Sequence, residues 1–216
     1  MLIKIEWDID PKDINQEVIK RAYKLLYSKA SIIKRIVGEV FTKYVKSSPE
    51  WIMLEASAVS TQDGDIAGHL GLRREDLFTS LNQILETWKK SVVLQLDRAN
   101  NRIDIYAVRT DYQEVLSLPV ASYISYNKNG IATEIPWLRW ILLEANTINI
   151  ANWTVLFKES DASRAWNAIM IRRTKTPGFW SMPSPFNKDE ATNFVSRIAQ
   201  DPLFYQTLSL ELSRAL

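Results

Sequence analysis

Residues 10–49 read DPKDINQEVIKRAYKLLYSKASIIKRIVGEVFTKYVKSSP, and this is the longest stretch of helical pattern in the protein. Apolar residues recur along the stretch at helical spacing, and no internal proline follows Pro11. Asp10 and Pro11 suit the cap and the first residue of a helix. An unbroken helix of this length would measure about 50 Å, so we expect one long helix or a pair broken at residues 28–31. The Ser-Ser-Pro of residues 47–49 predicts its end.

The rest of the chain predicts short strands mixed with further helices. Alternating apolar residues predict strands at residues 2–7, 92–96, 102–108, 147–157 and 166–173, the second and third forming a hairpin. Helices are expected at residues 74–90, 135–144, 189–199 and 202–215, the last capped by Asp201. The apolar residues 115–125 fit either an edge strand or a loop. Because strands and helices do not alternate as βαβ units, the fold class is α+β: a small antiparallel sheet packed against helices, with a long N-terminal helix or helical pair and C-terminal helices.

Two helices show which of their residues should be buried. The helix at 74–90 presents one apolar face, made of Leu77, Phe78, Leu81, Ile84, Leu85 and Trp88. The helix at 135–144 is apolar nearly all round, so we expect it in the core together with Trp137 and Trp140. A turn near Pro49 would divide the chain into residues 1–48, a strand with a basic helical arm, and residues 49–216, an α+β body with a Pro-rich loop. The alternative is a single domain.

Composition excludes several function classes. The 216 residues include no Cys and one His, so Cys chemistry and His-rich zinc sites are excluded. Neither common Gly-rich phosphate motif occurs. A net charge of +2 gives no general attraction to nucleic acid or membrane, no apolar run is long enough for a membrane span, and the first residues do not resemble a signal peptide. We therefore expect a protein that is not an enzyme and binds no cofactor or metal.

The single histidine is the main candidate for chemistry. His69 stands in GHLGL near Asp63 and Asp65, which resemble part of an acidic Ca²⁺ loop without its spacing. The simpler interpretation is a glycine turn. An enzyme would need acids to converge on His69, and nothing in the sequence brings Asp104, Glu134 or Glu144 together.

The stretch from Lys20 to Lys46 contains eight basic residues and one acid, Glu39. Such a run contacts nucleic-acid phosphates, lies on a solvated helix face, or orients packing between subunits. Lys34 and Arg35 are our candidate interface residues in this stretch.

Aromatic residues supply the other interface candidates. Trp166 and Trp180 flank strand-like and Pro-rich segments, where each belongs either to the core or to a subunit interface. Residues 179–187, FWSMPSPFN, contain two prolines and cannot form a regular ladder. We expect either an arm that reaches a neighbouring subunit, with Phe186 as a contact, or a surface loop.

Several segments together resemble a known group of proteins. They are SPEW (48–51), GDIAGHLGL (64–72), RTDYQEVLSLPVASY (109–123), IPWLRWILLEAN (135–146), SRAWNAIM (163–170), FWSMPSPF (179–186) and TNFVSRI (192–198). This pattern resembles the neck and tail-completion (head–tail connector) proteins of tailed bacteriophages. Ala145 and Ala165 stand where members of that group carry glycine.

The resemblance implies a structural virion protein with no enzymatic activity. It implies an oligomeric ring at the head–tail junction, assembled in the host cytoplasm, with portal or adaptor proteins on one side and tail terminator or tail tube proteins on the other. Double-stranded DNA would pass through the bore. The alternatives are a tail terminator or another tail protein, a DNA-binding module that uses the basic helix, and an enzyme built around His69.

Overall fold

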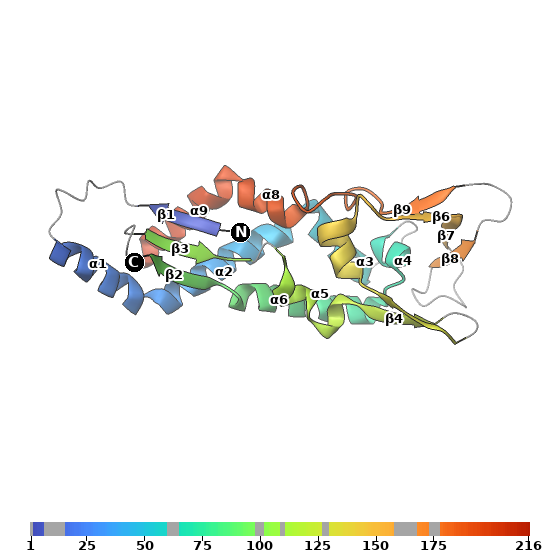
Figure 1. Cartoon of the computed structure of the whole chain (residues 1–216), viewed down its shortest axis with the longest axis horizontal. Helices are drawn as coiled ribbons and strands as arrows, with labels where there is room; N and C mark the ends of the chain where they lie inside the picture. The colour runs from blue at the N-terminus through green and yellow to red at the C-terminus, as the bar shows by residue number, and fades with distance from the viewer. Residues whose placement is uncertain are drawn as a thin grey trace.

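The computed structural model describes residues 2–6, 16–59, 65–97, 102–108, 111–126, 130–157, 168–172 and 178–216. The molecule is elongated, with helices joining a three-stranded sheet at one end to short strand pairs at the other (Figure 1). Its accessible surface of 13106 Å² exceeds the roughly 10,000 Å² typical of a compact protein of this mass, in line with that shape.

The three-stranded sheet joins the start of the chain to a later hairpin. Its order is β1-β3-β2, all antiparallel, with β1 at Leu2–Glu6, β2 at Val93–Asp97 and β3 at Arg102–Tyr106. Ile105 of the central strand is fully buried. Both the N-terminal strand and the hairpin predicted from alternation are confirmed.

The long helical stretch is a pair of helices. Helix α1 (Gln16–Ser28) ends before Lys29, and α2 (Ala30–Ser47) follows at once and ends at Ser48, so the break and the end are confirmed. A third helix, α3 (Pro49–Val59), then begins without a loop. The sequence pattern did not predict α3, because proline was interpreted as the end of one helix and can equally be the first residue of the next.

Helix α5 (Arg74–Lys90) has the predicted bounds. Five of its six predicted face residues are buried, but Phe78 is 57% exposed, so its assignment to the face was wrong. The preceding GHLGL (68–72) includes the end of the short helix α4 (Ile66–Leu70), closed by Gly71 in the left-handed conformation with φ of 67°.

The middle of the chain combines short helical turns with a second hairpin. Residues 115–125, expected as strand or loop, span α6 (Gln113–Leu116), the 3-10 helix η1 (Pro119–Ala121) and the start of β4 (Tyr123–Tyr126), which pairs with β5 (Ala132–Ile135). The helix predicted at 135–144 is present as α7 (Trp137–Arg139) followed by the π-helical turn η2 (Trp140–Glu144).

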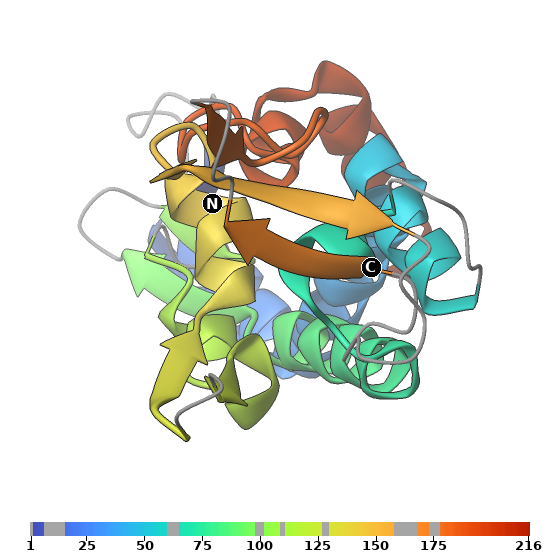
Figure 2. The ribbon, with the colours of Figure 1, turned by 90° about the vertical axis from the view of Figure 1, so that its right-hand side faces the viewer.

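Two strand pairs form the far end of the molecule (Figure 2). Strands β6 (Asn149–Ala151) and β7 (Trp153–Phe157) meet at Asn152, whose φ of 60° kinks the single strand that the sequence predicted. β6 pairs with β9 (Phe179–Ser181), and β7 pairs with β8 (Ala168–Arg172), all antiparallel. The chain closes with α8 (Phe194–Gln200), shorter than predicted, and α9 (Pro202–Ala215), where the Asp201 side chain accepts from Leu203 N as expected.

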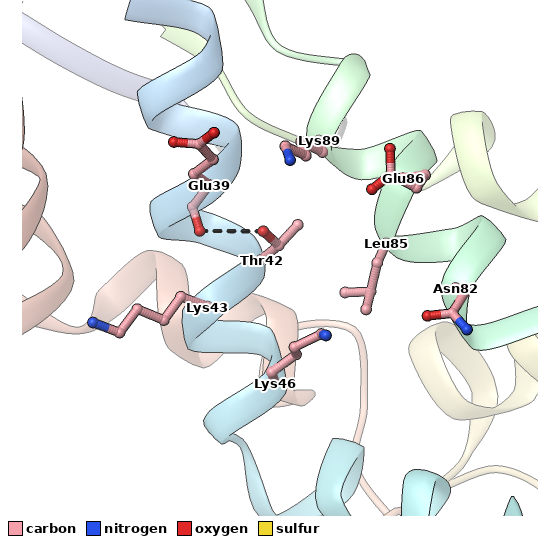
Figure 3. Close-up of a pocket in the computed structure, with 8 residues that line it drawn as sticks. All are labelled: Glu39, Thr42, Lys43, Lys46, Asn82, Leu85, Glu86 and Lys89. Carbon is pink, nitrogen blue, oxygen red and sulfur yellow. Dashed lines mark hydrogen bonds between the residues drawn. The ribbon is translucent and has the colours of Figure 1, made fainter. Parts of the chain in front are cut away.

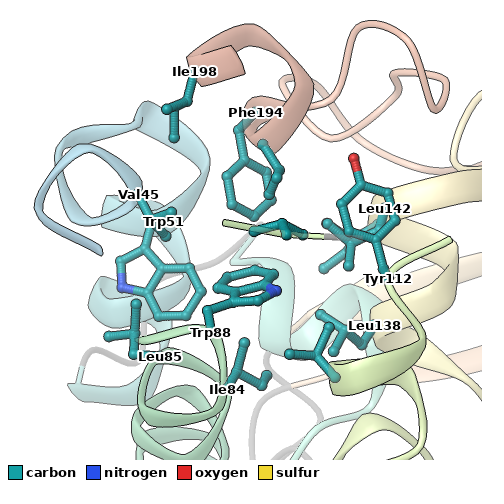
Figure 4. Close-up of a cluster of buried hydrophobic side chains, with 14 of the residues drawn as sticks. Val45, Trp51, Ile84, Leu85, Trp88, Tyr112, Leu138, Leu142, Phe194 and Ile198 are labelled. Atoms are coloured by element: carbon teal, nitrogen blue, oxygen red, sulfur yellow. The ribbon is translucent and has the colours of Figure 1, made fainter. Parts of the chain in front are cut away.

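One hydrophobic cluster continues across Pro49. It includes Val37 and Phe41 of α2 as well as residues from α3, α5 and α9. Its centre is aromatic: the ring centroid of Trp88 lies 5.9 Å from that of Phe41, 6.1 Å from that of Trp51 and 6.4 Å from that of Phe194. Figure 4 shows Trp51, Trp88 and Phe194 within this cluster. The fold class is α+β as predicted, and the described ranges form four small antiparallel sheets in place of one. The shared core fits the single-domain alternative.

Candidate interaction surface

His69 lies in an aromatic setting at the far end of the core. Its Nδ1 accepts a hydrogen bond of 3.2 Å from Trp180 Nε1, and its ring centroid is 5.1 Å from Phe157. Burial lowers the pKa of His69, and the charge of Asp65 opposes that shift. The imidazole is therefore a neutral acceptor that holds β9 against α4.

Asp65 is occupied by packing in the same region. One carboxylate oxygen caps α4 by accepting from Gly68 N at 2.5 Å, and the other pairs with Arg74 of α5. Gly68 itself is tightly enclosed, because a Cβ there would lie 2.7 Å from Phe157 and 3.0 Å from the Ala168 Cβ. These contacts attach the far strands to the helical body.

The other candidate acids do not converge. Glu134 accepts from Ser122 Oγ at 2.6 Å, Glu144 pairs with Arg139, and Asp104 is buried within β3. Among the described residues, no group of three or more His, Cys, Asp or Glu could hold a metal ion. Asp63 lies outside those residues. Within the same ranges, no helix has both the length and the apolar character needed to cross a bilayer.

The segments that carry the phage resemblance contact one another. Arg197 of TNFVSRI donates to Glu50 of SPEW at 2.6 Å, and the Trp51 ring lies 6.3 Å from Phe194. Asn193 is 1% exposed and donates to the Leu142 carbonyl at 2.7 Å.

The same network extends to three further segments, at 64–72, 109–123 and 179–186, whereas residues 163–167 of SRAWNAIM lie outside the described residues. Tyr112 accepts from Asn193 Nδ2 at 3.1 Å, Tyr123 donates to the Leu70 carbonyl at 2.5 Å, and the rings of Trp140 and Trp180 lie 6.5 Å apart. We call this set of contacts the framework. Its residues hold the body together, and one of them, Tyr123, also lines a shallow pocket of about 280 Å³ with Leu72 and Trp137.

Burial decides between the alternatives for two predicted interface residues. Trp180 is 6% exposed and Phe186 is 1% exposed, and both belong to the core cluster. Their assignment to a subunit interface was therefore wrong: β9 pairs with β6 and carries the Trp180 ring inward against His69 and Trp140. Phe179, beside Trp180, is 65% exposed. Trp166 lies outside the described residues.

The basic residues of α2 form an exposed ridge. Arg35, Glu39, Lys43 and Lys46 are all exposed, and the helical period brings them to one side, away from the buried Val37 and Phe41. Arg35 donates to Glu39 at 2.8 Å. Lys34 is also exposed but points to another part of the helix surface, so of the two predicted interface residues on α2 only Arg35 belongs to this ridge.

A groove runs along each side of the ridge. The first, of about 360 Å³, lies between α2 and α5, and across it Lys46 and Lys89 point toward each other's helix, as Figure 3 shows. The second, of about 410 Å³, lies between α2 and α9 and is lined by Lys43 and Arg214 among others.

Gly38 sets the spacing of the first groove. A Cβ at this position would lie 2.6 Å from the Lys89 carbonyl oxygen, so the backbones of α2 and α5 approach closely only because glycine is present. The sequence pattern identified the basic run but not the grooves, because nothing in it places α5 and α9 beside α2.

No protein-family model matches the chain, and neither the curated proteins nor the solved structures contain a significant match to it.

Proposed function

We propose that this chain is a structural subunit of a tailed bacteriophage, which assembles into a ring at the head–tail junction between portal or adaptor proteins and the tail. The proposal rests on one observation. Six of the seven segments that resemble neck and tail-completion proteins interlock as the framework, with Glu50–Arg197 and Asn193–Leu142 as polar links. Because these segments make structural contacts inside the body, their pattern suits a structural protein that acts by binding its neighbours through its surfaces.

The environment of His69 supports a role without bond chemistry. Its Nδ1 is engaged by Trp180, and the nearby Asp65 is engaged by Gly68 and Arg74. An enzyme would need such groups to face a substrate.

Electron microscopy of the purified protein tests the proposal. We expect closed rings of uniform diameter, and light scattering should give a mass that is a fixed multiple of 24.9 kDa. A strict monomer at high protein concentration, with no copy of the protein in virions, would contradict it. Antibody labelling of virions separates a neck ring from a tail terminator, because label on the tail side of the junction would favour the terminator.

A DNA-binding module is the second candidate, favoured by Lys43, Lys46 and Lys89 along the first groove. None of the three forms an ion pair with another residue that the structure describes. Affinity for duplex DNA should then fall steeply with salt, as counterion release requires. Lys43→Glu with Lys46→Glu should abolish it, whereas retention of binding would exclude this candidate.

A further inference from the structure

The ridge carries positive charge that its own neighbours do not neutralise. Around the first groove, Glu39 is paired with Arg35, and Glu86 Oε2 lies 3.7 Å from Lys90 Nζ. These pairs leave Lys43, Lys46 and Lys89 without an acidic partner among the described residues. The net charge of the whole chain is only +2, so acids elsewhere offset this face.

A surface of opposite charge surrounds the buried Tyr112. We define the acidic surface as Asp111, Glu114, Asp189 and Glu190, of which Asp111 and Glu190 are exposed and Glu114 and Asp189 are half-buried. Ser196 brings its two halves together, because its hydroxyl lies 3.0 Å from Tyr112 Oη and donates to the Glu190 carbonyl at 2.5 Å. Lys188 offsets part of the charge.

The pKa of Tyr112 reports the same proximity. Burial raises it, hydrogen bonds to Ser196 and Asn193 lower it, and the charges of Glu190 and Glu114 raise it further. Negative charge from both halves of the acidic surface therefore acts on one phenol.

The two surfaces cannot meet within one molecule. Val45 of α2 and Tyr112 lie on opposite sides of the core cluster around Trp88 (Figure 4). Two complementary surfaces that face different ways match the geometry of a head-to-tail contact between identical subunits.

We propose that the ridge of one copy docks on the acidic surface of the next. This inference rests on the proposed ring-forming function and assigns the surfaces that make its contact. A protein partner is favoured over nucleic acid because Glu39 and Glu86, although paired with Arg35 and Lys90, interrupt the lysines along the groove, whereas the phosphates of nucleic acid are uniformly negative. A protein surface can place an acid opposite each lysine and a base opposite each glutamate.

A reciprocal charge exchange tests the assignment in the full-length chain. Variant one carries Lys43→Glu and Lys46→Glu on the ridge, and variant two carries Asp111→Lys and Glu190→Lys on the acidic surface. Each variant alone sets like charges against each other, so we expect self-association to weaken by more than about a hundredfold. In an equal mixture each contact between the two variants again joins opposite charges, so sedimentation velocity should show restored assembly, in complexes where the variants alternate and the number of subunits is even.

The control for net charge is Lys24→Glu with Lys34→Glu, two exposed positions outside both grooves. It changes the charge as much as variant one and should assemble like the wild type. Circular dichroism should show that all variants remain folded, since the substituted side chains are exposed.

The possible outcomes separate the two proposals. If the wild type assembles and each variant does so equally well alone, the assignment of surfaces is wrong while the ring-forming function stands. If the wild type remains a monomer, both fail. If the mixture stays dissociated while variant one also loses DNA binding, nucleic acid is the partner of the ridge and the assignment is again wrong. Only restored assembly in the mixture supports it.

Discussion

Arg197 of α8 places Nη2 2.6 and 2.7 Å from the two carboxylate oxygens of Glu50 on α3. Glu50 is 2% exposed, whereas the Arg197 side chain is 42% exposed. The guanidinium thus reaches in from the surface to neutralise a carboxylate that water cannot solvate.

Arg197→Ala should therefore destabilise the protein. Removing one partner of a fully buried pair costs roughly 3–5 kcal/mol, and exposure of the arginine reduces this, so we expect a loss of about 2 kcal/mol in the free energy of unfolding. Urea denaturation measures it. Arg214→Ala is the control, since its pair with Glu211 is exposed and should change stability by less than about 0.5 kcal/mol. Equal effects of the two substitutions would contradict the role of burial.

Gly38→Ala should separate α2 from α5. Alanine favours a helix over glycine by about 1 kcal/mol, but the new Cβ would lie 2.6 Å from the rigid Lys89 carbonyl. We expect the clash to prevail with a net loss of about 1–3 kcal/mol. Thermal and urea unfolding test this against Ser31→Ala, an exposed site on the same helix that should be neutral or slightly stabilising. A stabilised Gly38→Ala variant would show that the helices do not approach as described.

Asn193→Ala should remove several buried hydrogen bonds together. Nδ2 donates to the Leu142 carbonyl at 2.7 Å and to the Glu190 carbonyl at 2.9 Å, while Oδ1 caps α8 by accepting from Ser196 N at 2.9 Å. We expect a loss of about 2–3 kcal/mol. Asn193→Asp keeps the cap but loses the donor and buries a charge, so it should unfold at lower urea than the wild type. A stable Asp variant would show that the cap alone matters.

His69 should make stability depend on pH. Because burial lowers its pKa in the folded protein, the unfolded chain binds the proton more tightly. Stability is therefore constant above the ordinary pKa of 6.5 and falls as pH drops below it, until the folded pKa is reached. The slope for one group is at most about 1.4 kcal/mol per pH unit.

His69→Asn isolates this effect, because its amide oxygen can replace Nδ1 as the acceptor for Trp180 without titrating. The difference in unfolding free energy between wild type and variant, measured from pH 7.5 to 5.5, should shrink or change sign toward acid. A difference that stays constant with pH would contradict the burial of His69 and the lowered pKa that follows from it.

Local patterns predicted the fold where one residue type decides the outcome. The bounds of α5 follow from Gly71 before it and a continuous amphipathic repeat, and Asp201 before Pro202 marks the start of α9. Phe78 was misassigned because the helical period gives a face but not the width of its contact, and at that edge of α5 its side chain is 57% exposed.

Tertiary context decided the rest. The kink at Asn152 depends on a left-handed residue that asparagine tolerates but does not require. Trp180 could be interface or core on sequence alone, and only the pairing of β9 with β6 carries its ring inward. Lys34 and Arg35 are neighbours in sequence, yet their side chains leave α2 in different directions. Given the positions of α5 and α9, only Arg35 lies on the ridge.

The close approach at Gly38 separates two properties that usually change together. Backbone atoms fix the width of the first groove, between α2 and α5, while flexible side chains at its rim supply the charge. Substitution of these lysines during evolution can therefore change which surface docks here without altering the packing of the helices beneath.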